Sequence, residues 1–137
     1  YEERLRALAA ANPGKVGVRV AFSNSLAHMI YAGADFFLMP SKFEPCGLGQ
    51  MIAMRYGAIP IVRAVGGLRD SVTEPETGIV FWDYSDQQLR HAVDRALALW
   101  CDSEGLMARR IRAMRADFSW SESTQKYLEL YRKISGR

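Results

Sequence analysis

The run Pro40–Gln50 contains residue types that can bind a ligand carrying both an anion and hydroxyl groups. Its carboxylate, Glu44, is followed by Pro45 and by two glycines, Gly47 and Gly49, which let a ligand approach the backbone closely. Where such a run opens a helix, unpaired N–H groups and the helix dipole favour an anion. A carboxylate beside that anion can bind sugar hydroxyls or stabilise positive charge at an anomeric carbon. The residues alone leave a plain structural role open as well, in which Glu44 and Pro45 only start the helix.

Short apolar strands that alternate with helices are expected to position this run. The alternation predicts a parallel sheet buried on both faces by helices, with right-handed crossovers. Ligands of such sheets bind beyond the carboxyl ends of the strands. The segments around Phe22, 40–48 and 62–68 each follow a strand and should therefore meet at one edge of the sheet. We expect strands at 15–22, 35–39, 58–62 and 79–81, and helices at 1–11, 23–32, 47–56 and 69–72.

After residue 82 the pattern changes to helices only. We expect one amphipathic helix capped by Asp86, a second around 107–118, and a third from Ser119 or Trp120. The sequence thus predicts one partial α/β domain over 1–137, with a Rossmann-like parallel sheet and flanking helices in 1–82 and an all-helical segment in 83–137. The side chains expected to face inward include Leu48, Met51, Ile52 and Tyr56 in the 47–56 helix, and Met107, Ile111 and Met114 in the second C-terminal helix.

Charge and composition argue against several classes of function. A formal net charge of +3 on 137 residues is too small to indicate nucleic-acid binding. No apolar run approaches the length of a membrane span, and no signal-peptide pattern opens the chain. One charged row, formed by Arg109, Arg110, Arg112 and Arg115, can be a basic patch or a solvated outer face. We favour the outer face, because the apolar side chains of the same helix are expected to point inward.

The cysteines and histidines suggest no metal centre. Two histidines and two cysteines lie without metal-ligand spacing. We interpret Cys46 and Cys101 as reduced thiols. Because no histidine is near Cys46 in sequence, we interpret it as a small, partly buried turn residue rather than a nucleophile. The chain also begins without Met, on sequence typical of the middle of a helix, so we expect a fragment of a larger protein.

Several motifs together resemble the signature of bacterial glycogen synthases and plant starch synthases. The resemblance covers most of the chain, and its central motif is highly specific. The matching segments are Ala34–Ser41, Phe43–Gln50, Ala53–Pro60, Gly66–Asp70, Phe118–Trp120 and Tyr127–Tyr131.

The resemblance implies the GT-B architecture, in which two Rossmann-like domains face each other across a cleft. That family transfers glucose from ADP-glucose to the 4-hydroxyl of an α-1,4-glucan, with retention and without a metal or other cofactor. This chain resembles the later part of the second domain, which binds the nucleotide sugar. The implied partners are ADP-glucose or ADP, the glucan acceptor and a missing N-terminal domain, with no nucleic acid or membrane. The implied location is the cytoplasm in a bacterium, or the plastid stroma in a plant or alga.

The resemblance also assigns roles to individual residues. Glu44 matches the acidic residue at the donor glucose and is the predicted catalytic residue. The segment Gly47–Gly49 matches the helix start whose N–H groups hold the diphosphate. Phe22 falls where the family places an aromatic ring, usually Tyr, against adenine, although a core aromatic is the alternative. Gly66 and Gly67 can line the cleft or only form a tight turn. The predicted substrate-binding set is Phe22, Cys46, Gly47, Leu48, Gly49, Gly66 and Gly67.

Departures from the family pattern leave other functions open. Gly49 stands where Thr is commonest, which removes a hydroxyl contact to phosphate. Ile52 stands where many related retaining transferases have a second Glu, and this favours the glycogen/starch synthase branch. The Lys-x-Gly-Gly-Leu motif and the basic residues that grip the diphosphate belong upstream of Tyr1. The alternatives are a GT-B transferase with another donor, such as UDP-glucose, and a non-catalytic nucleotide-binding module.

Overall fold

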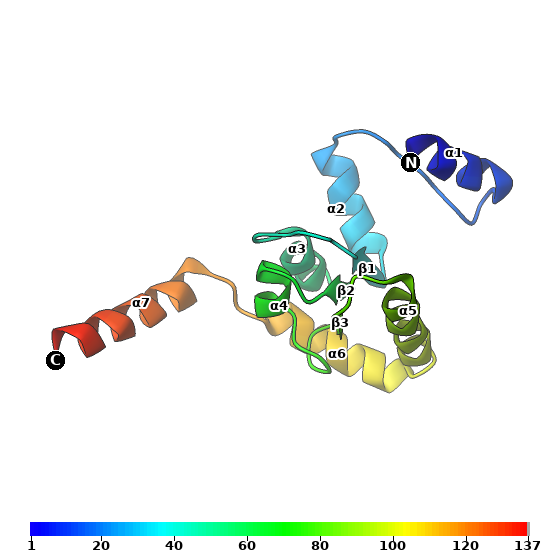
Figure 1. Cartoon of the computed structure of the whole chain (residues 1–137). Coiled ribbons are helices and arrows are strands. Elements are labelled where there is room, and N and C mark those ends of the chain that lie inside the picture. The colour runs from blue at the N-terminus through cyan, green and yellow to red at the C-terminus, as the bar shows by residue number, and fades with distance from the viewer. Residues whose placement is uncertain (137) are drawn as a thin grey trace.

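The computed structural model describes residues 1–136 and contains one small sheet with helices on both sides (Figure 1). The expected alternation of strands and helices is present from residue 24 onward. The elements are α1 (Glu2–Ala11), α2 (Asn24–Gly33), β1 (Phe36–Met39), α3 (Gly49–Arg55), β2 (Ile59–Arg63), α4 (Gly67–Ser71), β3 (Ile79–Phe81), α5 (Asp86–Trp100), α6 (Ser103–Arg115) and α7 (Trp120–Ser135).

The sheet is parallel, in the order β1-β2-β3. Phe36 pairs with Ile59, and Ile61 pairs with Ile79. The middle strand, β2, is buried from Ile59 to Val62, which explains its unbroken apolar sequence. The predicted α/β fold with a parallel sheet and flanking helices is therefore confirmed.

The core has two parts, one on each side of the sheet. On one side, Ile59 and Val62 pack with Met54 of α3, Leu68 of α4 and Leu106 of α6. On the other side, the alanines of α5 pack against strand residues; this cluster contains Ile61, Ile79, Phe81, Ala92 and Ala96. Small alanines let α5 lie close to the sheet. The C-terminal helices α5 and α6 thus cover opposite faces of the sheet and belong to the same core as the βα units.

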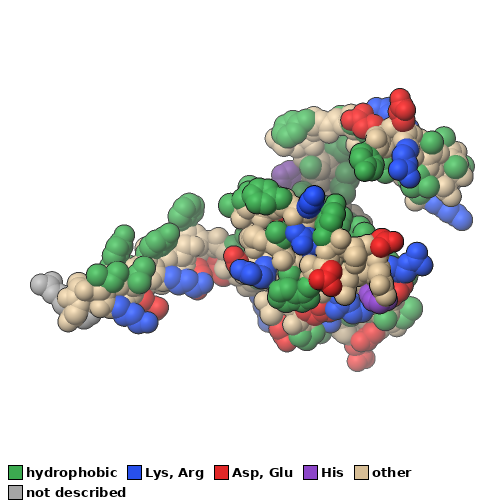
Figure 2. Space-filling model, in the orientation of Figure 1, with side chains coloured by type: hydrophobic (Ala, Val, Ile, Leu, Met, Phe, Trp, Pro, Cys, Tyr) green, Lys and Arg blue, Asp and Glu red, His purple; other side chains and the backbone are tan. Residues whose placement is uncertain are grey.

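The strand expected at 15–22 is wrong. Residues 16–20 have no regular secondary structure, and Phe22 is 94% exposed. A strand is stable only when its backbone N–H and C=O groups are paired. Within residues 1–136 no strand pairs with this segment, although its alternating valines suit a half-buried strand. The ends of the described chain also extend from the body, since neither α1 nor α7 buries a residue, and Figure 2 shows apolar side chains along the exposed α7.

The expected inward faces of two helices are wrong in part: in the 47–56 helix Met51 and Ile52 are partly buried, and Met51 packs against the core, whereas Tyr56 is exposed. Helix α3 buries Gln50, Ala53 and Met54. Leu48, expected inside, precedes the helix and is 67% exposed. Helix α6 buries Leu106 and Ala113, whereas the inward set Met107, Ile111 and Met114 is exposed.

The orientation of α6 follows from its arginines, which contact the body of the domain. Arg110 forms an ion pair with Asp35, just before β1. Arg112 pairs with the Glu76 carboxylate at 2.8 Å, and Arg109 donates to the Gly78 carbonyl oxygen at 3.4 Å. Burial lowers the pKa of Arg109. Three of these arginines thus contact loops around the sheet, and the expected solvated outer face is wrong for Arg109 and Arg110, whereas Arg112 and Arg115 are exposed.

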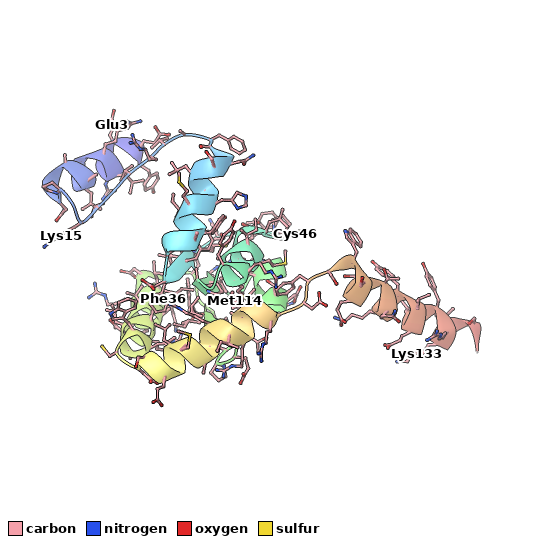
Figure 3. The ribbon with its side chains drawn as sticks, turned by 180° about the vertical axis from the view of Figure 1, so that it is seen from behind. Glu3, Lys15, Phe36, Cys46, Met114 and Lys133 are labelled. Atoms are coloured by element: carbon pink, nitrogen blue, oxygen red, sulfur yellow. The ribbon has the colours of Figure 1, made fainter. Side chains whose placement is uncertain are left out.

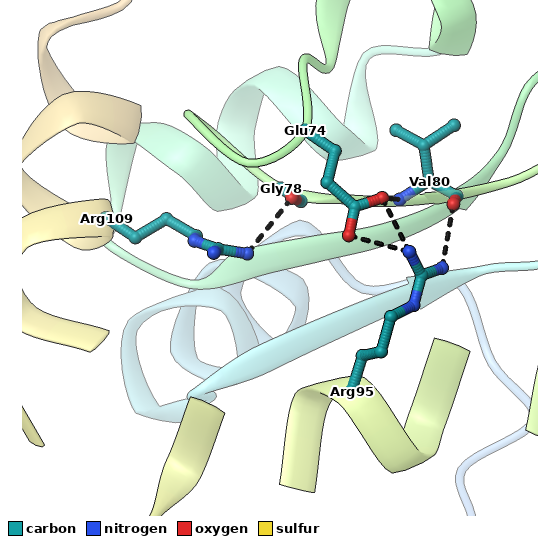
Figure 4. A network of polar contacts seen from close by, with 5 residues as sticks. All are labelled: Glu74, Gly78, Val80, Arg95 and Arg109. Carbon is teal, nitrogen blue, oxygen red and sulfur yellow. Dashed lines mark hydrogen bonds and ion pairs between the residues drawn. The ribbon is translucent and has the colours of Figure 1, made fainter. Parts of the chain in front are cut away.

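A second arginine network covers the open edge of β3 (Figure 4). Val80 donates its N–H to Glu74 Oε2 at 2.9 Å and accepts from Arg95 Nη2 at 2.8 Å. Arg95 Nη1 also contacts both Glu74 carboxylate oxygens, at 2.7 and 2.8 Å. The two side chains together satisfy the edge backbone groups that another strand would otherwise pair.

The ion pair in this network should contribute more to the free energy of unfolding than an exposed ion pair within one helix does. Arg95→Met should lower the free energy of unfolding by about 1–2 kcal/mol, because it removes a charged hydrogen bond to Val80 and leaves Glu74 without its cation. Urea unfolding of the protein followed by circular dichroism measures this loss.

The matched control is Lys126→Met, which removes an exposed i,i+4 pair with Glu122. That change should cost less than about 0.5 kcal/mol. Equal losses in the two variants would show that the β3 edge network contributes no more than an ordinary surface pair.

Candidate functional site

The loops that leave β1 and β2 touch each other through their backbones. Gly67 donates its N–H to the Pro45 carbonyl oxygen at 3.1 Å. A Cβ atom on Gly66 would lie 1.9 Å from the Glu44 carbonyl oxygen, and one on Gly67 would lie 2.1 Å from that of Cys46. Gly66 also has φ +47°, which side chains rarely tolerate. Gly66 and Gly67 are therefore more than a tight turn, because their missing side chains allow the two loops to meet.

Glu44 lies at this contact and is partly exposed. Within residues 1–136 no hydrogen bond or ion pair engages its carboxylate, and its side chain is half-buried. It does not start a helix, because α3 begins at Gly49 and Leu48 is its N-cap without a side-chain cap bond. The structural alternative, in which Glu44 only caps the helix, is wrong. A carboxylate without a structural partner at the carboxyl edge of a parallel sheet is available to a ligand.

Gln50 connects the two loops from within and was not singled out from the sequence. It is fully buried, and its Nε2 donates to the Gly47 carbonyl oxygen at 2.8 Å and to Ser71 Oγ at 2.9 Å. Ser71 Oγ in turn donates to the Gly67 carbonyl oxygen at 2.6 Å. The only signal in the sequence was a polar residue between Gly49 and the apolar part of a short helix.

Arg63, the last residue of β2, was also missed. Its Nε donates to the Ser41 carbonyl oxygen at 2.8 Å, and its Nη2 donates to that of Lys42 at 2.6 Å. On the other side, Nη1 is 3.5 Å from the Trp82 carbonyl oxygen, and the guanidinium lies 5.5 Å from the centre of the Tyr84 ring. A single charge that ends the apolar run of β2 was the available signal.

The remaining predicted site residues divide into two groups. Gly47 and Leu48 lie on the loop after β1, and Gly49 opens α3. Cys46 is on the same loop but is exposed, contrary to the partly buried position expected for it (Figure 3). Phe22 directly precedes the N-cap of α2, and the strand that would carry it to this edge is not formed. Its near-complete exposure makes the core alternative wrong.

Two of the hollows on the surface of the domain lie close to its loops. One, of about 310 Å³, is at the carboxyl edge of the sheet and is lined by Pro40, Phe81, Tyr84, Ser85, Asp86 and Leu89. The larger, of about 580 Å³, lies between α3 and the connection from α6 to α7, and no residue of the two contacting loops lines it. Asp117 in that connection accepts the Ser119 N–H, which lowers the pKa of its carboxyl group. Of the two, only the smaller hollow borders the strand ends, through Pro40 and Phe81.

Other kinds of site find no support in residues 1–136. No group of three or more His, Cys, Asp or Glu side chains there is arranged to hold a metal ion. None of the described helices combines the length and apolarity that crossing a membrane requires.

Comparison with known proteins gives consistent matches over nearly the whole chain. The family model for glycosyl transferases group 1 matches residues 1–115. A glycogen synthase of Thermodesulfovibrio yellowstonii is 48% identical over 136 residues, which cover 99% of this chain and 27% of that protein. A glycogen synthase of Syntrophotalea carbinolica is 47% identical and is covered over 29% of its length.

Solved structures match in the same way. The catalytic domain of starch synthase IV from Arabidopsis thaliana, bound to ADP and acarbose, superposes with a TM-score of 0.82 at 37% identity, over 98% of this chain and 30% of that one. Sucrose-phosphate synthase from Thermosynechococcus elongatus superposes with a TM-score of 0.68 at 28% identity, over 98% of this chain and 34% of that one.

The chain spans less than a third of the length of the two glycogen synthases it matches. The family model, in contrast, extends from the first residue through α6 and includes the sheet and both contacting loops. On this match, the chain belongs to the glycosyl transferases group 1 family.

Proposed function

We propose that this chain forms the donor-binding part of a retaining glucosyltransferase that extends α-1,4-glucan from ADP-glucose. The observation that carries the proposal is the Glu44 carboxylate, which has no structural partner within residues 1–136 and sits on a loop held at the carboxyl edge of the sheet. The similarity to glycogen synthases and to a starch synthase bound to ADP and acarbose supports this substrate class.

In this proposal, Glu44 orients the donor glucose and stabilises the positive charge that develops as the bond to the diphosphate breaks. The N–H groups of Gly47, Leu48 and Gly49 hold the diphosphate; the absence of a side-chain cap at Leu48 supports this role. Phe22 offers its exposed ring to adenine. Cys46, Gly66 and Gly67 line the same wall through their backbones. The donor supplies the reacting group, and no further cofactor takes part.

The glucan acceptor and the opposite wall of the cleft are proposed to involve a further domain. The partial coverage of the relatives supports this part of the proposal. Closure of the two walls would exclude water, which otherwise hydrolyses the donor. The bacterial relatives also support a cytoplasmic location, with the plastid stroma as the corresponding place in a plant or alga.

Replacement of the Glu44 carboxylate should separate catalysis from binding. Glu44→Gln in the full-length protein should lower glucose incorporation from ADP-glucose by about 10²–10³-fold, because a neutral amide stabilises little positive charge. The Kd for ADP, measured by calorimetry, should stay within about threefold, because ADP carries no glucose for Glu44 to contact.

The control is Asp94→Asn, a similar change at an exposed carboxyl on α5, which should leave both quantities unchanged. Full turnover in Glu44→Gln would remove Glu44 from its proposed role.

The contact between the loops also predicts a sharp glycine effect. Gly67→Ala should lower kcat/KM by about 10²-fold, because its Cβ would push the Cys46 carbonyl oxygen and shift the reacting geometry. Gly17→Ala is the matched control, since a Cβ there meets nothing within 4 Å. The idea fails if the two variants have the same kcat/KM.

A second donor, such as UDP-glucose, and a non-catalytic nucleotide-binding module remain the alternative functions. Stacking on Phe22 hardly discriminates between bases, so the donor must be tested directly. Phosphate binding alone gives no use for Glu44, which argues against the non-catalytic module.

Calorimetry of the full-length protein with ADP and UDP distinguishes these functions. The proposal expects ADP to bind at least about tenfold more tightly, a difference of about 1.4 kcal/mol. Tighter binding of UDP would replace the proposed donor, and tight nucleotide binding without glucose transfer would favour the non-catalytic module.

A further inference from the structure

We propose that Arg63 is a positioning residue for Glu44, acting by fixing the first half of the loop that carries the carboxylate. This inference rests on the proposed function, because it assumes that Glu44 acts on the donor. Arg63 itself contacts no part of the Glu44 side chain in the structure. Its effect passes through the backbone of the residues that precede Glu44.

The geometry of Arg63 spans the carboxyl ends of all three strands. The residue belongs to β2, and its bonds to the Ser41 and Lys42 carbonyl oxygens, at 2.8 and 2.6 Å, reach the loop after β1. Its contact with the Trp82 carbonyl oxygen at 3.5 Å reaches the segment after β3. Lys42, whose carbonyl oxygen accepts the shorter of the two bonds, is two residues before Glu44.

The two halves of this loop are held by different groups. Gly67 and Gln50 bind the carbonyl oxygens of Pro45 and Gly47, which follow Glu44. Arg63 binds the carbonyl oxygens that precede it. Hydrogen bonds therefore hold the backbone both before and after Glu44. Loss of Arg63 leaves only the backbone after Glu44 held in this way. A shift of about 1 Å in a reacting group can cost about 10²-fold in rate.

The chemistry of the anchor requires an arginine. Its planar guanidinium directs several N–H donors at fixed angles, so one side chain can bind two consecutive carbonyl oxygens and still reach a third. The Arg63 guanidinium also lies 5.5 Å from the centre of the Tyr84 ring, and Lys42 Nζ is 6.0 Å from the same centre. A lysine offers only a compact charge at this place and cannot direct several N–H donors at fixed angles to these carbonyl oxygens.

The test uses Arg63→Met and Arg63→Lys in the full-length protein, with Arg95→Met as the matched control. Arg95 likewise binds a backbone carbonyl oxygen, that of Val80. This oxygen lies on the open edge of β3 and belongs to no loop of the site. Arg63→Met should lower kcat by about 10²-fold while the Kd for ADP stays within about threefold. Arg63→Lys should lose at least about tenfold in kcat. Arg95→Met should lower the unfolding temperature and leave kcat, measured well below that temperature, within about twofold.

A double-mutant cycle with Glu44→Gln then separates positioning from a general structural role. If Arg63 acts through Glu44, Arg63→Met in the Glu44→Gln background should change the residual turnover by less than about threefold. Multiplied losses in the double variant would overturn the inference, as would parallel losses of kcat and ADP binding. If Arg63→Met does not fold, Arg63→Lys decides the matter, and wild-type kcat in it overturns the inference.

The outcomes distinguish this inference from the function on which it rests. Undiminished turnover in Glu44→Gln would defeat the proposed role of Glu44 itself. A large loss in Glu44→Gln together with wild-type turnover in both Arg63 variants would defeat only the role of Arg63.

Discussion

The backbones of Glu44–Cys46 and of Gly66–Gly67 lie against each other with no room for a side chain between them. This contact exists because β1 and β2 are parallel neighbours, so that the loops leaving their carboxyl ends emerge side by side. Everything proposed for the site depends on it. A larger residue at either glycine would separate the loops and move the segment that carries the Glu44 carboxylate.

Polar side chains keep this contact in place from inside and outside. Gln50 is buried beneath the loops and bridges them through Ser71. Arg63, at the end of β2, binds backbone carbonyl oxygens of the residues just before Glu44. Buried or half-buried polar groups are costly unless their hydrogen bonds are made, so such bridges favour one loop arrangement over others. Within residues 1–136 the Glu44 carboxylate makes no such bond, and neither does the buried Oε1 of Gln50, whose Nε2 forms the bridge.

The same principle organises the rest of the domain. Arginines of α5 and α6 bind carbonyl oxygens and carboxylates around the sheet, at Val80, Gly78 and Glu76. These bonds hold the C-terminal helices against the βα units, so the two parts form one body. A helix whose charged side chains are used in this way can leave methionines exposed without losing its place in the fold.

The sequence by itself determined the parallel sheet, most helices and the motif around Glu44. Apolar runs such as Ile59–Val62 and caps such as Ser23 depend on neighbours close in sequence, and local patterns report them well, although the N-cap of α5 is Ser85 and not the expected Asp86. The strand expected at 15–22 failed because pairing needs a partner that no local pattern supplies. The tertiary structure alone decided that Gly66 and Gly67 touch the Glu44 loop, that Glu44 caps no helix, and that Gln50 and Arg63 hold the loop. The contacts of Gly66, Gly67, Gln50 and Arg63 join residues about 20 positions apart, and spacing along the chain carries no information about which distant carbonyl oxygens a side chain will meet.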